Sequence, residues 1–401
     1  MVKKRHISLP GGFTASGVKC GIKAADVEDL AILAADKAVP AAILTTQNQL
    51  VGAPITWCRS VLPRGHGRCR AIVVNSGNSN VCTGKTGLRN AKAMASRVAE
   101  LIGAKDQHIL VGSTGVIGHR LPMGKIRQGI DKAIASLGTS ADDAVLRGIM
   151  TTDTHEKSAV AKAHIGRRSF TVAGIAKGSG MIAPNLATMI SLITTDLAVT
   201  PAALYKALRA ATAVSFNAIT IDSDTSTSDM VAAFASGAVG NKPITAKSPG
   251  WTAFAAALEQ VCRSLARQVV ADGEGATKLV EVAIRGARND AEAEIAARAV
   301  ADSPLFKCAV NGADPNWGRI AMALGKSAAR IAPEKLNIKI GGVTIFARGT
   351  GRNFDATKVA KHLSGQDIRV DCDLHLGRGQ FTALTCDLSR QYVTINADYH
   401  T

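Results

Sequence analysis

The most unusual stretch of this 401-residue chain leads into Thr188, a hydroxyl residue at the start of an apolar run. Lys177, two glycines and a proline precede it, and residues 189–193 have the composition of a buried strand. If the bond between Ala187 and Thr188 were cut, the hydroxyl would be a nucleophile with its own α-amine as base. Such an amine, with an unperturbed pKa of about 8, can be neutral near physiological pH. Periodicity alone favours a plainer interpretation, a loop that enters a strand.

Two other short segments could supply groups to a reaction. Ser113–Thr114–Gly115 follows a short predicted strand, where small residues can leave backbone N–H groups pointing into a cleft, as an oxyanion site requires. Gly273–Glu274–Gly275 places a carboxylate between two glycines, which let the backbone bend and approach a ligand closely. Taken alone, each segment is more typical of an ordinary turn.

The elements that must position these residues alternate between strands and helices. Strand patterns cover residues 71–75, 109–112, 189–193, 278–284, 337–346, 368–374 and 391–397. Helical patterns cover residues 87–103, 140–150, 200–213, 251–271 and 291–301. Ser140 with Asp143 forms a capping-box pattern, and Thr200 with Pro201 forms a helix start. The alternation predicts an α/β or α+β fold of layered sheets and helices, and the length allows a two-lobed molecule.

Composition excludes several classes of protein. The chain is 46% hydrophobic and 20% charged, which is ordinary for a globular protein, and the lack of an 18-residue apolar run argues against a membrane span. The net charge of +17 is spread along the chain and aromatic residues make up only 4%, which argues against a nucleic-acid partner. Substrates that carry carboxylates suit this charge equally well.

Metal and nucleotide sites lack their usual spacings. The eight cysteines form no CxxC pair and the nine histidines no HExxH pair, so we expect reduced thiols and no metal. Gly84–Lys85–Thr86 resembles the end of a phosphate loop, but Ser79 stands where the motif needs glycine. No GxGxxG motif lies between a strand and a helix, so a dinucleotide site is not supported either.

Residues 177–196 resemble the processing site of the ornithine acetyltransferase family, the glutamate N-acetyltransferases of arginine biosynthesis. The family pattern K-G-[SA]-G-M-[IL]-x-P-x-[LM]-A-T-M-[LI], with T-T-D shortly after, is intact. Further family motifs follow in the same order along nearly the whole chain, at residues 12–17, 75–80, 83–84, 113–118, 150–154, 215–217, 224–227, 312–319 and 396–399. Ala183 and residues 308–310 depart slightly from the pattern, and residues 347–354 fit poorly and receive no role.

The resemblance implies a role for each matching residue. Thr188 is expected to be the nucleophile, first in self-cleavage after Ala187 and then in catalysis at an N-terminal-nucleophile-like site. Thr114 and Gly115 match the oxyanion hole. The positions that match substrate-binding residues are Thr154, Lys177, Thr188, Glu274, Asn396 and Thr401. Lys177 can pair with an amino-acid carboxylate and Glu274 with the side-chain ammonium of ornithine.

The implied activity is transfer of acetyl from N2-acetylornithine to glutamate by a ping-pong mechanism without a cofactor. Cleavage would yield an alpha chain of residues 1–187 and a beta chain of residues 188–401, and the family implies an α2β2 heterotetramer. Because the first motif begins near Gly12, we expect no presequence and a cytoplasmic location. The alternative is a related amidohydrolase that releases acetate to water. The sequence leaves open whether acetyl-CoA is also a donor and whether the enzyme is feedback-regulated.

Overall fold

The computed structural model describes residues 6–183 and 189–398, which form two compact units. Unit 1 holds the described residues up to 217 together with 224–269, and unit 2 holds 218–223 together with 270–398. The mixed α/β class with layered sheets and helices is as predicted. The predicted cleavage position, between residues 187 and 188, falls within unit 1 and is not the boundary between the units.

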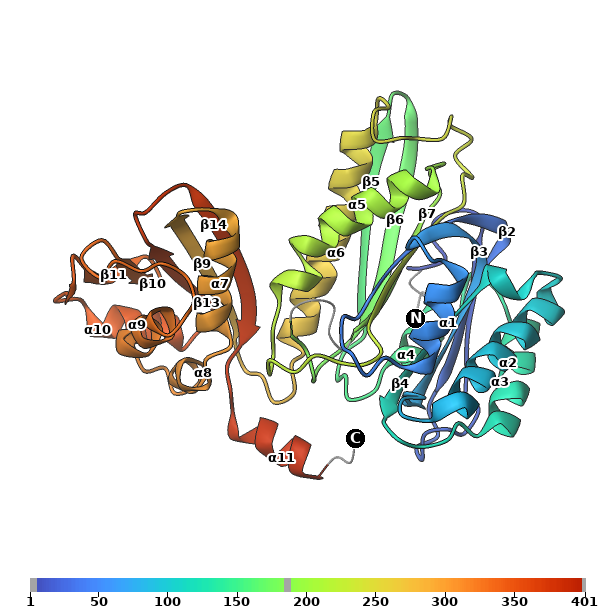
Figure 1. Ribbon diagram of the computed structural model, residues 1–401, viewed down its shortest axis with the longest axis horizontal. Helices are drawn as coiled ribbons and strands as arrows, with labels where there is room; N and C mark the ends of the chain where they lie inside the picture. Colours follow the sequence, from blue (N-terminus) through green and yellow to red (C-terminus); the bar gives the residue numbers. More distant parts are fainter. Residues whose placement is uncertain (1–5, 184–188, 399–401) are drawn as a thin grey trace. The chain divides into compact units, whose positions relative to one another are not determined.

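Unit 1 is built on an eight-stranded sheet in the order β4-β3-β2-β8-β7-β6-β5, with β1 paired to β2 (Figure 1). Its strands are β1 (Phe13–Val18), β2 (Leu30–Thr45), β3 (His66–Asn78), β4 (Ile109–Val116), β5 (Lys157–Ile165), β6 (Arg168–Lys177), β7 (Ile190–Thr195) and β8 (Met230–Ala235). The pairs β3–β4 and β7–β8 are parallel, and the other pairs are antiparallel. Strands β7 and β8 are buried along their whole length, which explains their nearly unbroken apolar sequences.

Helices cover both faces of this sheet. They are α1 (Ala53–Val61), α2 (Gly84–Ile102), α3 (Met123–Ala135), α4 (Asp142–Ile149), α5 (Pro201–Ala213) and α6 (Trp251–Ala271), with short 3-10 turns η1 (Asp106–His108) and, at the unit boundary, η2 (Phe216–Ala218). Alternate residues of β3 point to opposite sides, so Val73 packs with α2 and α3 while Ile72 packs with α4. Helix α5 begins as predicted, because Thr200 Oγ1 accepts a hydrogen bond from the Ala203 N–H.

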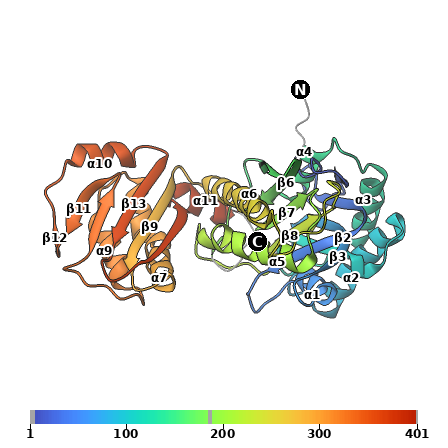
Figure 2. The ribbon, with the colours of Figure 1, turned by 90° about the horizontal axis from the view of Figure 1, so that it is seen from above.

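Unit 2 contains a six-stranded sheet in the order β12-β11-β10-β13-β9-β14 (Figure 2). Its strands are β9 (Leu279–Ala287), β10 (Asn337–Ile340), β11 (Val343–Ala347), β12 (Thr350–Gly351), β13 (Asp367–Asp373) and β14 (Gly379–Cys386). Its helices are α7 (Asp290–Ala301), α8 (Pro304–Asn311), α9 (Trp317–Gly325), α10 (Ala356–Leu363) and α11 (Arg390–Asp398). One apolar core joins β9, β10, β11 and β13 to α7, α8, α9 and α10.

Three sequence predictions were wrong in detail. Residues 391–397 form helix α11 and not a strand: their β-branched side chains favour a strand, but α11 has no buried side chain and Val393 is 64% exposed. A helix satisfies its own backbone hydrogen bonds, so it needs no sheet partner. Residues 337–346 form the hairpin β10–β11 and not one strand. Ser140 caps nothing, because α4 begins at Asp142 and its N-cap, Ala141, has no side-chain cap.

Two further findings bear on the class of protein. All eight cysteines are free thiols. Throughout residues 6–183 and 189–398, none of the helices has the length and apolar character needed to cross a membrane.

Candidate active site

The ends of two parallel strands, β3 and β4, place the predicted oxyanion residues side by side with a polar loop. Ser76 pairs with Thr114 and Gly77 with Gly115 in the register of the two strands. One position earlier, Ser113 Oγ donates to Asn75 Oδ1 at 2.6 Å, which ties the strands together through their side chains. Ser113 to Gly115 therefore belong to β4 itself, and the ordinary turn favoured by the sequence alone is not found.

Glycine is required where these strand ends meet. Gly115 has φ +120° and Gly77 has φ +94°, both in the region that favours glycine. A Cβ atom on Gly115 would lie 2.4 Å from the carbonyl carbon of Gly77, a distance that no packed structure tolerates. The register shifts at Gly77 and Asn78, as in a β-bulge, and such irregularities re-aim the backbone next to many active sites.

Lys177 brings a buried cation to this place. It is the last residue of β6, and its side chain is almost fully buried. Its Nζ donates a hydrogen bond to Thr114 Oγ1 at 3.2 Å. Two of the residues that the sequence assigns to different roles, the carboxylate-binding Lys177 and the oxyanion residue Thr114, are thus in direct contact.

A buried ion pair interacts with Lys177. Lys157 Nζ, at the start of β5, lies 2.7 Å from Asp153 Oδ1, and both side chains are inaccessible to solvent. The same carboxylate accepts the N–H groups of Gly178 at 2.6 Å and Thr151 at 3.0 Å. Burial alone would raise the pKa of Asp153, but the charges of Lys157 and Lys177 and the Gly178 N–H outweigh it, so this pKa is lowered. Asp153 is therefore a fixed negative charge.

Asp229, directly before β8, is the other carboxyl near Lys177. It is completely buried, and its Oδ1 accepts the N–H of Met189 at 2.9 Å. Burial raises its pKa well above the usual value, against the opposing effects of the Met189 N–H and the Lys177 charge. The pKa values of the two carboxyls are therefore shifted in opposite directions, although both carboxyls interact with the same lysine.

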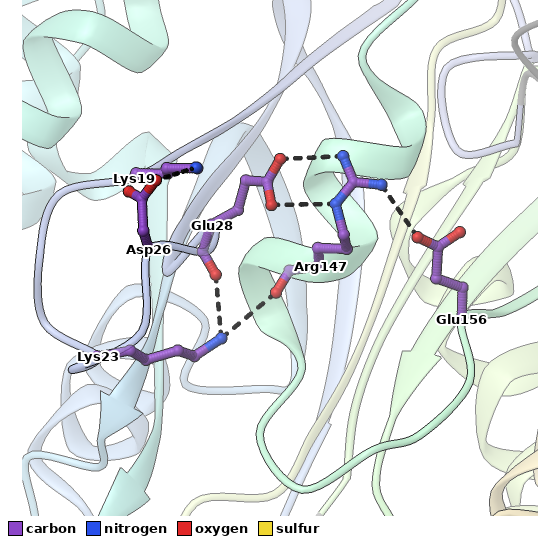
Figure 3. Close-up of polar contacts among 6 residues, drawn as sticks. All are labelled: Lys19, Lys23, Asp26, Glu28, Arg147 and Glu156. Atoms are coloured by element: carbon purple, nitrogen blue, oxygen red, sulfur yellow. Dashed lines mark hydrogen bonds and ion pairs between the residues drawn. The ribbon is translucent and has the colours of Figure 1, made fainter.

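The loop before β2 carries Lys23, whose polar contacts are drawn in Figure 3. Lys23 Nζ donates to the carbonyl oxygens of Glu28, at 3.0 Å, and Arg147, at 3.5 Å. The Arg147 guanidinium in turn pairs with Glu28 at 2.9 Å and Glu156 at 3.1 Å. Burial lowers the pKa of Lys23, with a further lowering from Lys177, while Asp29 and Asp153 oppose it. Lys23 thus belongs to the same electrostatic cluster as Lys177.

The predicted residues of unit 2 form a separate contact. Asn396, on α11, donates from Nδ2 to Glu274 Oε2 at 2.9 Å. Glu274 lies in the turn between α6 and β9, where Gly275 has φ +68° and a Cβ atom would come within 2.5 Å of the Tyr392 nitrogen. The glycine that flanks Glu274 thus allows α11 to approach, which is the close backbone approach that the sequence suggested.

The predicted residues accordingly fall into four groups. Thr114, Gly115 and Lys177 come together in unit 1, and Glu274 and Asn396 come together in unit 2. Thr154 lies in the exposed loop next to Asp153. The remaining predictions, Ala187, Thr188 and Thr401, lie outside the described residues.

The sequence profile of the ArgJ family matches residues 14–401. This chain belongs to the ArgJ family. A relative from Geobacter sulfurreducens, named "Arginine biosynthesis bifunctional protein ArgJ", is 45% identical over 97% of this chain and 99% of its own length. The protein of the same name from Bacillus subtilis is 40% identical over 98% of this chain and 96% of its own. The family resemblance expected from the motifs is confirmed.

A solved ArgJ structure from Bacillus halodurans is also similar, with 41% sequence identity and a TM-score of 0.51. The match covers 98% of that solved chain but only 52% of this one. The solved chain is therefore about half as long as this chain, whereas the two ArgJ relatives match it from end to end.

Sequence reasoning gave no role to Asp153, Lys157 or Asp229. Asp153 lies in a motif that carried the resemblance, but only the fold brings it to Lys177 and Gly178. Asp229 carries one signal that could have been noticed: an acidic residue directly before the wholly apolar strand 230–235. A carboxyl at such a position is buried with the strand and needs a partner.

Proposed function

We propose that this protein is a self-processing acetyltransferase that moves an acetyl group from N2-acetylornithine to glutamate. The observation that carries the proposal is the buried contact between Lys177 and Thr114, beside Gly115, in a chain that belongs to the ArgJ family. Lys177 supplies a cation for a substrate carboxylate, and the end of β4 supplies groups that can stabilise an oxyanion. The two lie at one place.

Self-cleavage would come first. The Thr188 hydroxyl attacks the carbonyl carbon of Ala187, the acyl group shifts from nitrogen to oxygen, and water hydrolyses the ester. This leaves residues 1–187 with a new carboxylate and residues 188–401 with a free α-amine. The half-length of the solved Bacillus halodurans chain supports the existence of processed chains in the family.

Turnover would use the same hydroxyl. With the α-amine as base, Thr188 attacks the acetyl carbonyl, Thr114 and Gly115 stabilise the oxyanion, and ornithine leaves an acetyl-threonine. Glutamate then takes the acetyl group by the reverse chemistry. We assign Lys177 to the amino-acid carboxylate and Glu274, held by Asn396, to the side-chain ammonium of ornithine. Thr154 and Thr401 are further proposed substrate contacts.

The assembly and setting are proposals as well. We propose an α2β2 heterotetramer in the cytoplasm that works without a metal or a cofactor. Acetyl-CoA is a proposed second donor, in keeping with the word "bifunctional" in the names of the relatives. Family membership favours the transferase over the amidohydrolase alternative.

The experiment that tests this function is the intact mass of the purified chain under denaturing conditions, followed by an activity assay. We expect two fragments, the second beginning at Thr188, and ornithine release from N2-acetylornithine that depends on glutamate. Thr188→Ala should abolish both cleavage and transfer, and Thr188→Ser should keep part of each. Acetate release without glutamate would instead identify a hydrolase, and a chain that stays whole yet transfers acetyl would exclude the N-terminal nucleophile.

A further inference from the structure

Lys23 brings a second cation to the strand ends that carry Thr114 and Gly115. A Cβ atom on Gly77 would lie 3.1 Å from Lys23 Cγ, so the stem of this lysine packs directly on Gly77. Gly77 is the register partner of Gly115. Lys177 approaches from β6 and donates to Thr114 Oγ1 at 3.2 Å. Two lysines from different elements therefore flank the same pair of strand ends.

A buried carboxylate fixes the backbone of Lys23. Asp29 is inaccessible to solvent, and its Oδ2 accepts the N–H groups of Ile22, at 2.6 Å, and Lys23, at 3.2 Å. Its Oδ1 accepts the N–H of Cys20 at 2.7 Å. The Asp29 carbonyl accepts the Ser76 N–H, near the end of β3, at 2.9 Å. Asp29 therefore ties the loop that carries Lys23 to the strand ends of the candidate site.

The ammonium of Lys23 has carbonyl oxygens as its partners (Figure 3). Nζ donates to the carbonyls of Glu28, at 3.0 Å, and Arg147, at 3.5 Å. The neighbouring carboxylates, those of Glu28 and Glu156, pair with the Arg147 guanidinium instead. Within residues 6–183 and 189–398, no carboxylate forms an ion pair with Lys23. An ammonium has three donors, so Lys23 keeps one for a ligand.

The proposed reaction brings two substrates of opposite side-chain charge to one site. The side chain of N2-acetylornithine ends in an ammonium, for which Glu274 is proposed, whereas that of glutamate ends in a carboxylate. The Glu274 carboxylate would repel this second carboxylate, because like charges disfavour each other. Lys177 is already assigned to the α-carboxylate, which both substrates share. The acceptor therefore needs a further cation.

We propose that Lys23 is a specificity-determining residue that binds the side-chain carboxylate of the acceptor glutamate. The inference rests on the proposed function, because it concerns the second half of the acetyl transfer. A half-buried ammonium with carbonyl partners gains a charge-assisted hydrogen bond when a carboxylate binds to it. N2-acetylornithine has no side-chain carboxylate, so the first half of the reaction does not use this bond.

A purely structural role for Lys23 makes different predictions. Arg147 lies in the last turn of α4, and a lysine that binds the last carbonyls of a helix stabilises its end. If this were the whole role of Lys23, replacing it would lower stability and would slow the reactions of both substrates alike. Lys23→Gln separates the two roles, because its amide can still donate to the two carbonyls but carries no charge.

Lys19 supplies a matched control. It lies in the same loop between β1 and β2, but its Nζ pairs with Asp26 at 2.8 Å, and both side chains are exposed (Figure 3). Lys19→Gln therefore removes one positive charge from this loop without changing the contact between Lys23 and Gly77.

The test measures kcat/KM for each substrate on the processed wild type, Lys23→Gln, Lys23→Arg and Lys19→Gln, because each value of a ping-pong reaction reports its own half of the cycle. We expect Lys23→Gln to lower kcat/KM for glutamate by about 10–100-fold and to change that for N2-acetylornithine by less than about threefold. Lys23→Arg, which keeps the charge, should recover part of the loss. The wild type should prefer glutamate to glutamine, an uncharged acceptor of the same shape, and Lys23→Gln should lose this preference.

The outcomes separate the inference from the function on which it rests. Lys19→Gln should keep the wild-type values for both substrates. Equal losses for both substrates in Lys23→Gln, or an unchanged value for glutamate, overturn the role of Lys23 and leave the acetyltransferase intact. If Lys23→Gln fails to fold, the wild type still decides, since equal use of glutamate and glutamine would show that no cation binds the side-chain carboxylate. A wild type without glutamate-dependent release of ornithine overturns the proposed function instead.

Discussion

The carboxylate of Asp387, in unit 2, accepts four hydrogen bonds, whereas that of Asp229, in unit 1, accepts one backbone N–H, from Met189, and has the Thr46 and Ser226 hydroxyls beside it. The four donors to Asp387 come from the Thr277 N–H and hydroxyl, the Lys278 N–H and the Asn311 side chain, all between 2.6 and 2.9 Å. Both groups lie beside a sheet and both are buried. Asp387 is held by two backbone N–H groups and two side chains, whereas Asp229 is held by one backbone N–H.

The two units also differ in the contacts of a buried lysine. Lys307 in unit 2 donates to the Ile221 carbonyl at 2.7 Å and the Thr385 hydroxyl at 2.8 Å. Lys177 in unit 1 donates at a longer 3.2 Å to Thr114, a residue with a proposed catalytic role. We infer that the polar cluster of unit 2 stabilises the fold, whereas that of unit 1 joins buried charges to residues with a proposed catalytic role.

The largest effect should come from Lys177→Met, which removes the cation next to Thr114. We expect kcat/KM for N2-acetylornithine to fall by about 10²–10³-fold, because the substrate carboxylate loses its counter-charge. Lys307→Met, the equivalent change in unit 2, should lower thermal stability while the folded fraction keeps its activity. Loss of activity in Lys307→Met without loss of stability would break the proposed division between the units.

The next largest effect concerns stability. Asp387→Ala should lower the free energy of unfolding by about 3 kcal/mol, because four donors lose their acceptor at once and the buried ones pay a desolvation cost. Urea unfolding followed by circular dichroism measures it. A change below about 1 kcal/mol would mean that the cluster of unit 2 is not the stabilising element described above.

The pH dependence of stability should separate the two carboxyls of unit 1. The folded-state pKa of Asp153 is lowered, so its contribution is present above the unfolded pKa and is lost as pH falls through the folded value. The pKa of Asp229 is raised, so the folded state keeps a proton that the unfolded state has lost, and stability falls as pH rises between the two values. Asp229→Asn should therefore lose less unfolding free energy than the wild type as the pH rises from the unfolded pKa towards the raised folded one, by up to about 1.4 kcal/mol per pH unit. Parallel curves for the two proteins would contradict the raised pKa.

The smallest effect should come from the ion pairs at the surface of unit 1. Glu156→Gln removes one partner of Arg147, at 3.1 Å, where both side chains are about 40% exposed. Solvent screens such pairs, so the free energy of unfolding should change by only about 0.5 kcal/mol and the effect should shrink in high salt. A loss above about 2 kcal/mol would show that the contacts drawn in Figure 3 act as one network with the buried cluster.

Local signals predicted much of the fold. The apolar stripe of α2, the cap of α5 and the span of α6 were all readable, because each depends on residues three or four positions apart. The errors arose at α11, where residues with a strand propensity have no neighbouring strand to pair with. They also arose where a side chain interacts with a residue that is distant in the sequence. Asp143, the predicted partner of Ser140, lies 3.5 Å from His6 Nε2 instead, and the cap at Ser140 does not form.

The same distinction between local and distant interactions applies to the candidate site. Thr114, Gly115, Lys177, Glu274 and Asn396 could be named because they lie in contiguous motifs. The contacts that support these residues could not be predicted, because the partners are far apart in the sequence. Asp153 and Gly178 are 25 residues apart, and Asp229 and Met189 are 40 residues apart. These carboxyls are buried, and their pKa values are shifted, only once the eight-stranded sheet has formed.

That sheet also fixes what a cut after Ala187 would mean for the two polypeptides. Strand β7 of the second piece pairs with β6 of the first, and β8 of the second pairs with β2 of the first, so the later piece threads two central strands between neighbours supplied by the earlier one. Separating them would unravel the middle of the sheet, and dilution alone would not do it. On a denaturing gel the enzyme would appear as two chains, but in folding it would behave as one, since neither half could complete the eight-stranded sheet of unit 1 alone.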